Sequence, residues 1–159
     1  MTEHYTRFIV CVPIPNKEAA TIANGFRNHV LSVFGAPAKC LVDGGTEFEG
    51  AFEDLCRQCL IDRRVTSPDS PEGNGLTERV ARAIKFCFKK LALEKGLRDY
   101  EWDELLWSLA LSYNATKQES TGVASFHAAI CRGGTEVATK PAILKLVKVQ
   151  RRWGGGAGG

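Results

Sequence analysis

The stretch KCLVDGGTEF, residues 39–48, gives the strongest local indication of the fold. Residues 39–42 predict a short strand that opens directly into Asp43, Gly44 and Gly45. Such an opening is expected where a buried strand of an α/β protein meets a loop at its carboxyl end. From the residues alone, Asp43 is either a metal ligand or the first residue of an Asx turn.

Strands and helices are predicted to alternate on both sides of this stretch. β-branched and aromatic residues bounded by prolines predict a strand, and apolar residues at a 3.6-residue spacing predict helices. Their order, strand, helix, strand, helix, strand, helix, helix, predicts an α/β fold. The expected strands are 6–14, 39–42 and 62–66; the expected helices are 17–34 after an Asn16 cap, 48–60, 76–95 and 102–115, with a loop at 67–75.

The long helix that begins at Leu76 has two different faces. An apolar stripe predicts burial of Leu76, Val80, Ala83, Ile84, Cys87 and Leu91. The opposite face carries Glu78, Arg82, Lys85 and Lys89. Glu78, expected in the first helical turn, is either a ligand or a favourable partner of the helix dipole. The basic side chains form either an ordinary solvated surface or a phosphate-binding one.

Length and composition predict one globular domain without a membrane span. The chain has 159 residues, of which 44% are hydrophobic and 25% charged. Its net charge of +3, from 21 basic and 18 acidic residues, is too small to indicate a nucleic-acid-binding protein by itself. The start of the sequence does not resemble a secretion signal, so we expect a protein of the nucleus or cytoplasm.

The six cysteines are expected to be reduced and buried rather than joined in disulfides. They stand mostly inside apolar periodic segments. Cys56 and Cys59 have the spacing of metal ligands, but the sequence contains no second pair of this kind and has three histidines. We therefore expect no zinc site.

Several ordered motifs resemble the catalytic core of an integrase of the retroviral and LTR-retrotransposon type. They are HYTRFIVCVPIPN at 4–16, VDGGTEF at 42–48, TSPDSPEGNGLTER at 66–79 and SYNATKQESTGV at 112–123. The resemblance implies a ribonuclease H-like mixed sheet flanked by helices. It also implies that the first, central strand is missing, so that the core is truncated at its amino end. We expect the core-like domain to cover 1–132 and a basic, glycine-rich flexible tail to cover 133–159.

The same resemblance implies the site residues. Asp43 and Glu78 match two of the three carboxylates that hold a pair of Mg²⁺ (or Mn²⁺) ions in such cores, and they are the expected catalytic and metal-binding residues. Glu3 does not match the first Asp, since it falls at the end of the second strand of the family pattern. Asn74, Arg82 and Lys85 match positions that contact DNA.

The expected function is that of an integrase core remnant. Its ancestral role would be DNA integration by metal-dependent strand transfer, with residual nucleic-acid binding and without catalysis in this chain. Two alternatives stay open: a noncatalytic self-association module, and an active nuclease or transferase that uses a substitute acid. The expected partners are DNA and a second copy of the chain, with weak binding of Mg²⁺ and no membrane.

Overall fold

The structure is a computed structural model that describes residues 1–66, 71–95, 103–130 and 143–145. Strands and helices alternate as expected for an α/β protein. In chain order the elements are β1 (Thr2–Glu3), α1 (Ala19–Phe26), η1 (Arg27–Leu31), α2 (Ser32–Phe34), β2 (Lys39–Val42), η2 (Thr46–Phe48), α3 (Ala51–Gln58), β3 (Asp62–Val65), α4 (Pro71–Lys95), α5 (Asp103–Ala115), α6 (Ser125–Ile130) and β4 (Ile143–Lys145).

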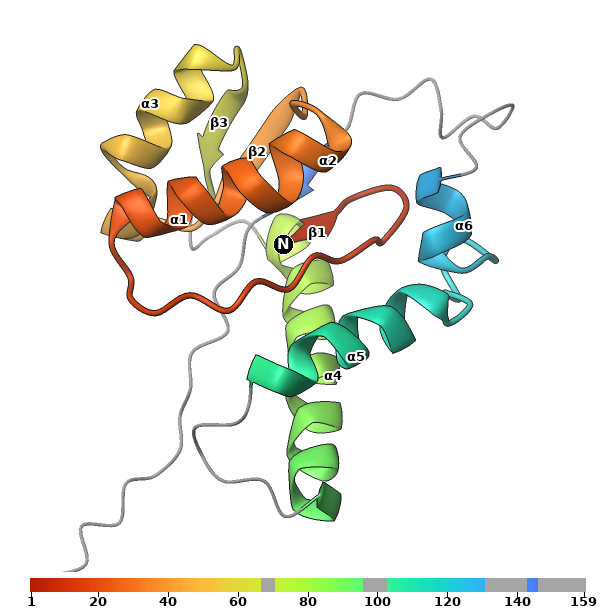
Figure 1. Cartoon of the computed structure of the whole chain (residues 1–159). Helices are drawn as coiled ribbons and strands as arrows, with labels where there is room; N and C mark the ends of the chain where they lie inside the picture. Colours follow the sequence, from red (N-terminus) through yellow and green to blue (C-terminus); the bar gives the residue numbers. More distant parts are fainter. Residues whose placement is uncertain (67–70, 96–102, 131–142, 146–159) are drawn as a thin grey trace, which may run out of the picture.

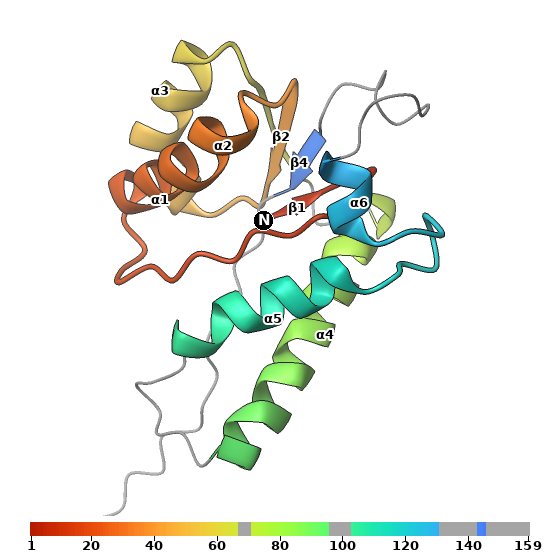
Figure 2. The same ribbon diagram turned by 45° about the vertical axis from the view of Figure 1, so that its right-hand side comes forward.

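A four-stranded mixed sheet in the order β1-β4-β2-β3 forms the centre of the molecule. β2 runs parallel to β3 and to β4, whereas β1 is antiparallel to β4. The helices α1 and α3 cover one side of this sheet, and α4, α5 and α6 lie on the other (Figures 1 and 2). The predicted strands before Asp43 and at 62–66 are thereby confirmed, as is the mixed sheet flanked by helices.

β4 corrects two predictions. Residues 133–159 were expected to form a flexible tail, but residues 143–145 form a strand between β1 and β2. The predicted domain end at residue 132 therefore excludes a segment that belongs to the sheet. The centre of the sheet is nevertheless closed, because β4 lies between β1 and β2 and pairs with both.

The amino-terminal segment forms a hairpin rather than the predicted strand at 6–14. Glu3 N–H donates to the Phe8 carbonyl at 2.8 Å, and Val10 N–H donates to the Met1 carbonyl at 3.0 Å. A tight turn separates the two arms, with Arg7 at a positive φ of 63°. Beyond Val10 the chain is irregular up to α1.

The predicted helix at 17–34 is confirmed but starts at Ala19 and contains a π-helical segment, η1. Asn16 does not cap it directly. Its side-chain oxygen accepts a hydrogen bond from Glu18 N–H at 3.1 Å, which forms a local turn just before the helix. The later start follows, because the Asn16 side chain stabilises the turn and not the first helical residues.

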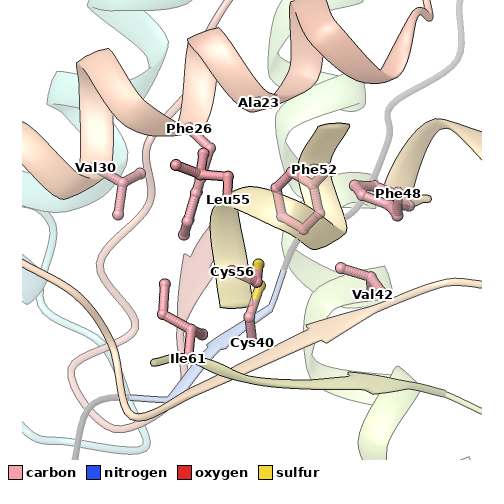
Figure 3. Close-up of a cluster of buried hydrophobic side chains, with 10 residues drawn as sticks. All are labelled: Ala23, Phe26, Val30, Cys40, Val42, Phe48, Phe52, Leu55, Cys56 and Ile61. Carbon is pink, nitrogen blue, oxygen red and sulfur yellow. The ribbon is translucent and has the colours of Figure 1, made fainter. Parts of the chain in front are cut away.

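The hydrophobic core lies between the sheet and the helices α1 and α3 (Figure 3). Phe52 is fully buried, and its ring centroid lies 5.4 Å from those of both Phe26 and Phe48. Aromatic pairs in this range contribute beyond the area that they bury. The buried members are Ala23, Phe26, Val30, Cys40, Val42, Phe48, Phe52, Leu55, Cys56 and Ile61.

The helix α4 begins at Pro71, five residues earlier than predicted. Proline is favoured at the first helical position because its missing N–H needs no partner there. Glu78 is therefore not in the first turn, and an interaction with the dipole at the end of the helix does not explain it. Of the predicted apolar stripe, Val80 is buried, but Cys87 is exposed.

The described cysteines, which exclude Cys131, are free thiols as predicted, but their burial differs. Cys40 and Cys56 are buried, Cys11 and Cys59 are half-buried, and Cys87 is exposed. Within the described part of the chain, the helices include none with the length and apolar character needed to cross a bilayer.

Candidate functional site

Asp43 stands at the carboxyl end of β2, as predicted. Its side chain is exposed, and its Oδ1 atom accepts a hydrogen bond from Gly45 N–H at 3.2 Å. The Val42 carbonyl just before it accepts hydrogen bonds from Thr66 N–H at 2.8 Å and from Thr66 Oγ1 at 3.1 Å. Asp43 thus forms an Asx turn on a strand end that is fixed by its neighbour, and its other carboxylate oxygen points to no described partner.

Glu47 is a second acid beside Asp43, and the sequence analysis missed it. A side-chain carbon added at Gly45 would lie 3.1 Å from Asp43 Oδ1 and would collide with the Glu47 carboxylate. Both carboxylates therefore lie close to the α-carbon of Gly45. The signal was present in the motif DGGTE, because a glycine between two acids leaves room for both side chains.

Glu78 is exposed on α4, in the second helical turn of that helix. Among the described residues, the structure gathers no group of three or more His, Cys, Asp or Glu side chains that could hold a metal ion. Asp43 and Glu78 are thus two exposed carboxylates without a third ligand in the described set. Such a donor set does not fit a pair of magnesium ions, which need carboxylates converging on both.

The Glu3 carboxylate is used within its own turn. It is largely buried, and its Oε2 atom accepts hydrogen bonds from Thr6 N–H and Thr6 Oγ1, both at 2.6 Å, and from Tyr5 N–H at 3.1 Å. These bonds close the hairpin. One oxygen of the carboxylate is thus occupied by the turn, whereas Glu3 Oε1 is buried without a hydrogen-bond partner among the described residues.

The basic stripe of α4, defined as Arg82, Lys85 and Lys89, is exposed on the same face as Glu78. Residues three and four positions apart lie on one side of a helix, so the three cations form a line along it. Asn74 lies in α4 as well, three residues after Pro71; its side chain lies outside the described residues. This arrangement presents positive charge along one edge of an exposed helix.

Asn114 is a buried polar residue that the sequence analysis did not single out. Its Nδ2 atom donates to the Ile9 carbonyl at 2.9 Å, and its Oδ1 atom accepts from Ile9 N–H at 2.9 Å. A primary amide can donate one hydrogen bond and accept another side by side. The Asn114 side chain thus makes the two backbone hydrogen bonds that a neighbouring strand would make to Ile9. Asn114 thereby attaches α5 to the outer arm of the hairpin.

Cys40 and Cys56 form a thiol pair in the core, remote from solvent. The hydrogen bond between the two thiols raises the pKa of Cys40 and lowers that of Cys56, and burial adds to the pKa increase at Cys40. Figure 3 shows the two sulfur atoms facing each other between β2 and α3. The pair packs the strand that carries Asp43 against its covering helix.

Comparison with known sequences reveals similarity to Pol polyproteins. The chain is 25% identical over 114 residues to the retrovirus-related Pol polyprotein from transposon 412 of Drosophila melanogaster, covering 70% of this chain and 9% of that protein. It is 31% identical over 108 residues to the Pol polyprotein of feline endogenous virus ECE1, covering 67% of this chain and 10% of that protein. The chain thus spans about a tenth of these relatives. No model of a known protein family matches the sequence.

Comparison with solved structures reveals the fold. The HTLV-2 integrase catalytic core domain in complex with magnesium superimposes with a TM-score of 0.65 at 16% identity, covering 79% of both chains. The catalytic core domain of BIV integrase superimposes with a TM-score of 0.64 at 18% identity, also covering 79% of both chains. A chain of the simian T-cell lymphotropic virus intasome gives a TM-score of 0.67 at 14% identity, covering 77% of this chain and 44% of that one.

The fold is that of a retroviral integrase catalytic core, which is ribonuclease H-like. In sequence, the chain resembles a segment of retroviral and retrotransposon Pol polyproteins. Both parts of the predicted resemblance are confirmed.

Proposed function

We propose that this chain is an integrase core-like domain that binds DNA through the basic stripe of α4 and does not by itself catalyse strand transfer. The observation that carries the DNA-binding part is the exposure of Arg82 and Lys85 on the same helical face as Glu78. The proposal also rests on the resemblance to integrase cores, in which the matching positions contact DNA. Its partner would be duplex DNA without sequence preference.

The charge arrangement favours contact with phosphates over contact with base edges. The stripe is linear and its side chains are long, so each can reach a phosphate oxygen without entering a groove. Phosphate contacts carry no sequence information directly. Binding would therefore be similar for unrelated duplexes and would weaken steeply with added salt, because it releases counterions.

The set of acidic side chains is the reason to expect no strand transfer by this chain alone. Two-metal phosphoryl transfer needs acidic side chains from separate elements around both ions. Asp43 and Glu78 supply two such groups, while Glu3 is held in its turn by Thr6. If Mg²⁺ or Mn²⁺ binds, Asp43 and Glu78 are the residues that would hold it, and two carboxylates are too few to hold the two ions that the reaction needs.

DNA binding can be tested with fluorescently labelled duplexes of unrelated sequence, measured by anisotropy over a range of salt concentrations. The variant Arg82→Ala/Lys85→Ala should bind more weakly to all duplexes, and its log–log salt slope should fall by about 2, since two phosphate contacts are lost. The matched control is Lys17→Ala/Arg27→Ala, which removes two exposed cations near α1. If both double variants weakened DNA binding equally, the net charge of the protein would explain the binding, and the basic stripe would not be the DNA-binding surface.

Catalysis can be tested on the same duplexes with Mg²⁺ or Mn²⁺. The chain should produce neither nicks nor strand-transfer products above a metal-free control. Turnover that disappears in Asp43→Asn would overturn the proposal. The Asp43→Asn variant should retain DNA binding, which separates loss of chemistry from loss of the substrate.

The position of Glu47 favours one specific alternative, an active nuclease that uses a substitute acid. Glu47 brings a second carboxylate close to that of Asp43, since both lie next to the point where a side chain of Gly45 would begin. If metal-dependent nicking is found, the single substitutions Glu47→Gln and Asp43→Asn should each abolish it. Glu49→Gln, which changes a nearby exposed acid, should not. Activity that survives Glu47→Gln would exclude this residue as the substitute.

A further inference from the structure

Cys40, Cys56 and Cys59 lie where β2 meets α3, two of them in the core and the third nearer the surface. Cys40 in β2 is 0% exposed, and Cys56 in α3 is 1% exposed. Figure 3 shows their sulfur atoms facing each other between the strand and the helix. Cys59, at the end of α3, is half-buried and packs against the same core. The fold therefore brings two thiols into contact in the interior and leaves a third one, within reach of solvent, about one helical turn away.

The backbone around the pair holds the two sulfur atoms in place. The Cys56 carbonyl accepts a hydrogen bond from Ile61 N–H at 2.9 Å, which attaches the end of α3 to the start of β3. β3 in turn pairs with β2 in a register that places Arg63 opposite Cys40. A disulfide requires a narrow range of distances and directions between its two residues. Since strand and helix are fixed to each other next to both cysteines, the pair is preorganised for a bond between its sulfur atoms.

The charges around the pair distinguish its two thiols. The hydrogen bond from Cys40 lowers the pKa of Cys56, and the Arg63 guanidinium adds to this decrease against the opposing effects of burial and of Glu53. Arg63 is itself held by Glu53 at 3.2 Å. The thiolate is the form of cysteine that attacks a disulfide. Cys56 is therefore the nucleophile of the pair, and Cys40 is the donor that stabilises its thiolate.

The donor set favours a covalent bond over zinc binding. In the part of the chain that the structure describes, no third His, Cys, Asp or Glu joins the pair in a group that could hold a metal ion. Zinc sites in proteins use three or four such ligands. Two thiols in contact can instead lose two electrons and two protons together and form a disulfide.

We propose that Cys40 and Cys56 are a redox-sensitive pair that closes to a disulfide, and that an external disulfide such as oxidised glutathione reaches the pair through Cys59. Cys59 is the entry because it is the member of the three with access to solvent. It stands three residues after Cys56, and residues at this spacing are neighbours on a helix surface. The sequence CRQC thus connects the surface of α3 with the buried pair.

Three exchange steps carry the oxidation inward. Cys59 attacks oxidised glutathione, so that a mixed disulfide forms at Cys59 and one reduced glutathione leaves. Cys56 then attacks the Cys59 sulfur and releases the second reduced glutathione. Cys40 attacks the Cys56 sulfur and releases Cys59 as a thiol. In sum, Cys40 and Cys56 lose two electrons and two protons, and one oxidised glutathione takes them up as two reduced molecules.

The disulfide attaches the strand that presents Asp43 to the helix that covers it. β2 ends immediately before Asp43, and α3 begins shortly after η2, which contains Glu47. A cross-link between them restricts the unfolded chain, so the oxidised protein should unfold at a higher urea concentration than the reduced protein. Oxidation would thus stabilise the region that carries these two acids.

Peptide mapping of the full chain tests the pair without any substitution. The reduced protein is incubated with oxidised glutathione, quenched in acid and digested, and the linked peptides are identified by mass. The expected main product of the folded protein is the Cys40–Cys56 disulfide with Cys59 free. The same chain oxidised in urea is the control, in which this link should fall to a minor share because the fold no longer holds the two sulfur atoms together.

Two single variants test the entry. Cys59→Ser should slow formation of the Cys40–Cys56 disulfide about tenfold or more, because the buried pair then reacts only when the structure opens locally. Cys11→Ser, which removes another half-buried thiol, is the matched control and should leave the rate unchanged. Cys40→Ala should stop the reaction at a disulfide between Cys56 and Cys59.

Four results would overturn the proposal. The first is a folded protein in which Cys59 carries glutathione while Cys40 and Cys56 stay free. The second is an equal share of the Cys40–Cys56 link in the folded and the unfolded chain, since the fold would then not create the pair. A rate that Cys59→Ser lowers no more than Cys11→Ser would exclude the entry, and a urea midpoint that does not rise on oxidation would exclude the stabilisation. None of these results depends on DNA binding.

Discussion

Replacing Asn114 by alanine should destabilise the protein strongly, because one side chain satisfies two buried backbone groups. Asn114 is 3% exposed and Ile9 is 2% exposed, and both hydrogen bonds between them measure 2.9 Å. Asn114→Ala leaves the N–H and the carbonyl of Ile9 without partners. Each buried polar group that loses its partner costs about 1–3 kcal/mol, so with two such groups the free energy of unfolding should fall by about 2–6 kcal/mol.

Urea unfolding followed by circular dichroism measures this loss. With an m-value of about 2 kcal/mol/M, the midpoint should move down by roughly 1–3 M while the slope stays the same. Asn28→Ala, an exposed asparagine of η1, is the matched control and should change stability by less than about 0.5 kcal/mol. Asn114→Asp should also be destabilising, because it keeps the acceptor for the Ile9 N–H but places a carboxylate oxygen against the Ile9 carbonyl. If Asn114→Ala lost no more than the control, the amide would not be the partner of Ile9.

Three further changes test the packing, the backbone and the titration of the molecule. Phe52→Ala, in the core, should cost about 3–5 kcal/mol in urea unfolding, whereas Phe86→Ala, which is 71% exposed, should cost almost nothing; similar losses would contradict the assigned core. Gly35→Ala should destabilise the protein, because Gly35 has a φ of +79° that alanine rarely adopts. Gly75→Ala should stabilise it by about 0.5–1 kcal/mol, because Gly75 lies inside α4 with open space around it. If calorimetry gave both substitutions the same sign, the backbone conformations assigned to the two glycines would be refuted. Burial lowers the pKa of the Met1 amino group below its usual value of 8.0. Because the unfolded chain then binds a proton more readily, the free energy of unfolding should fall as the pH decreases from above 8 towards the lowered pKa. A chain acetylated at its amino group should lack this pH dependence. Identical pH profiles for the two chains would show that the amine is not its source.

The parts of the fold that local patterns determine were predictable. Apolar residues at helical spacing gave α1, α3 and α5 to within a few residues, because each buries one stripe against the core. The strand before Asp43 followed from a short run that ends at a glycine pair. The start of α4 was mispredicted because proline and glycine were interpreted as a loop, although Pro71 suits a first helical position.

The position of Asp43 could be predicted, but its surroundings could not. Asp43 and Glu47 approach each other because Gly45 lacks a side chain, which is a matter of loop geometry and not of periodicity. The role of Glu3 could not be predicted either. No sequence pattern around this residue distinguishes a metal ligand from a carboxylate that accepts hydrogen bonds within a turn. Its three hydrogen bonds became visible only in three dimensions.

The two ends and the centre of the sheet are stabilised in different ways, and this difference explains why the tail was misjudged. At one end, β3 is an exposed edge strand with the charged residues Asp62, Arg63 and Arg64, which oppose pairing with another chain. Near the other end, the hairpin arm at Ile9 is paired by the side chain of Asn114 instead of a strand. The centre is closed by β4, whose described residues lie far along the chain from their partners, so no local pattern indicates the pairing. Since pairing over such a distance is determined by tertiary contacts and not by local periodicity, the place of residues 143–145 in the sheet could be recognised only from the structure.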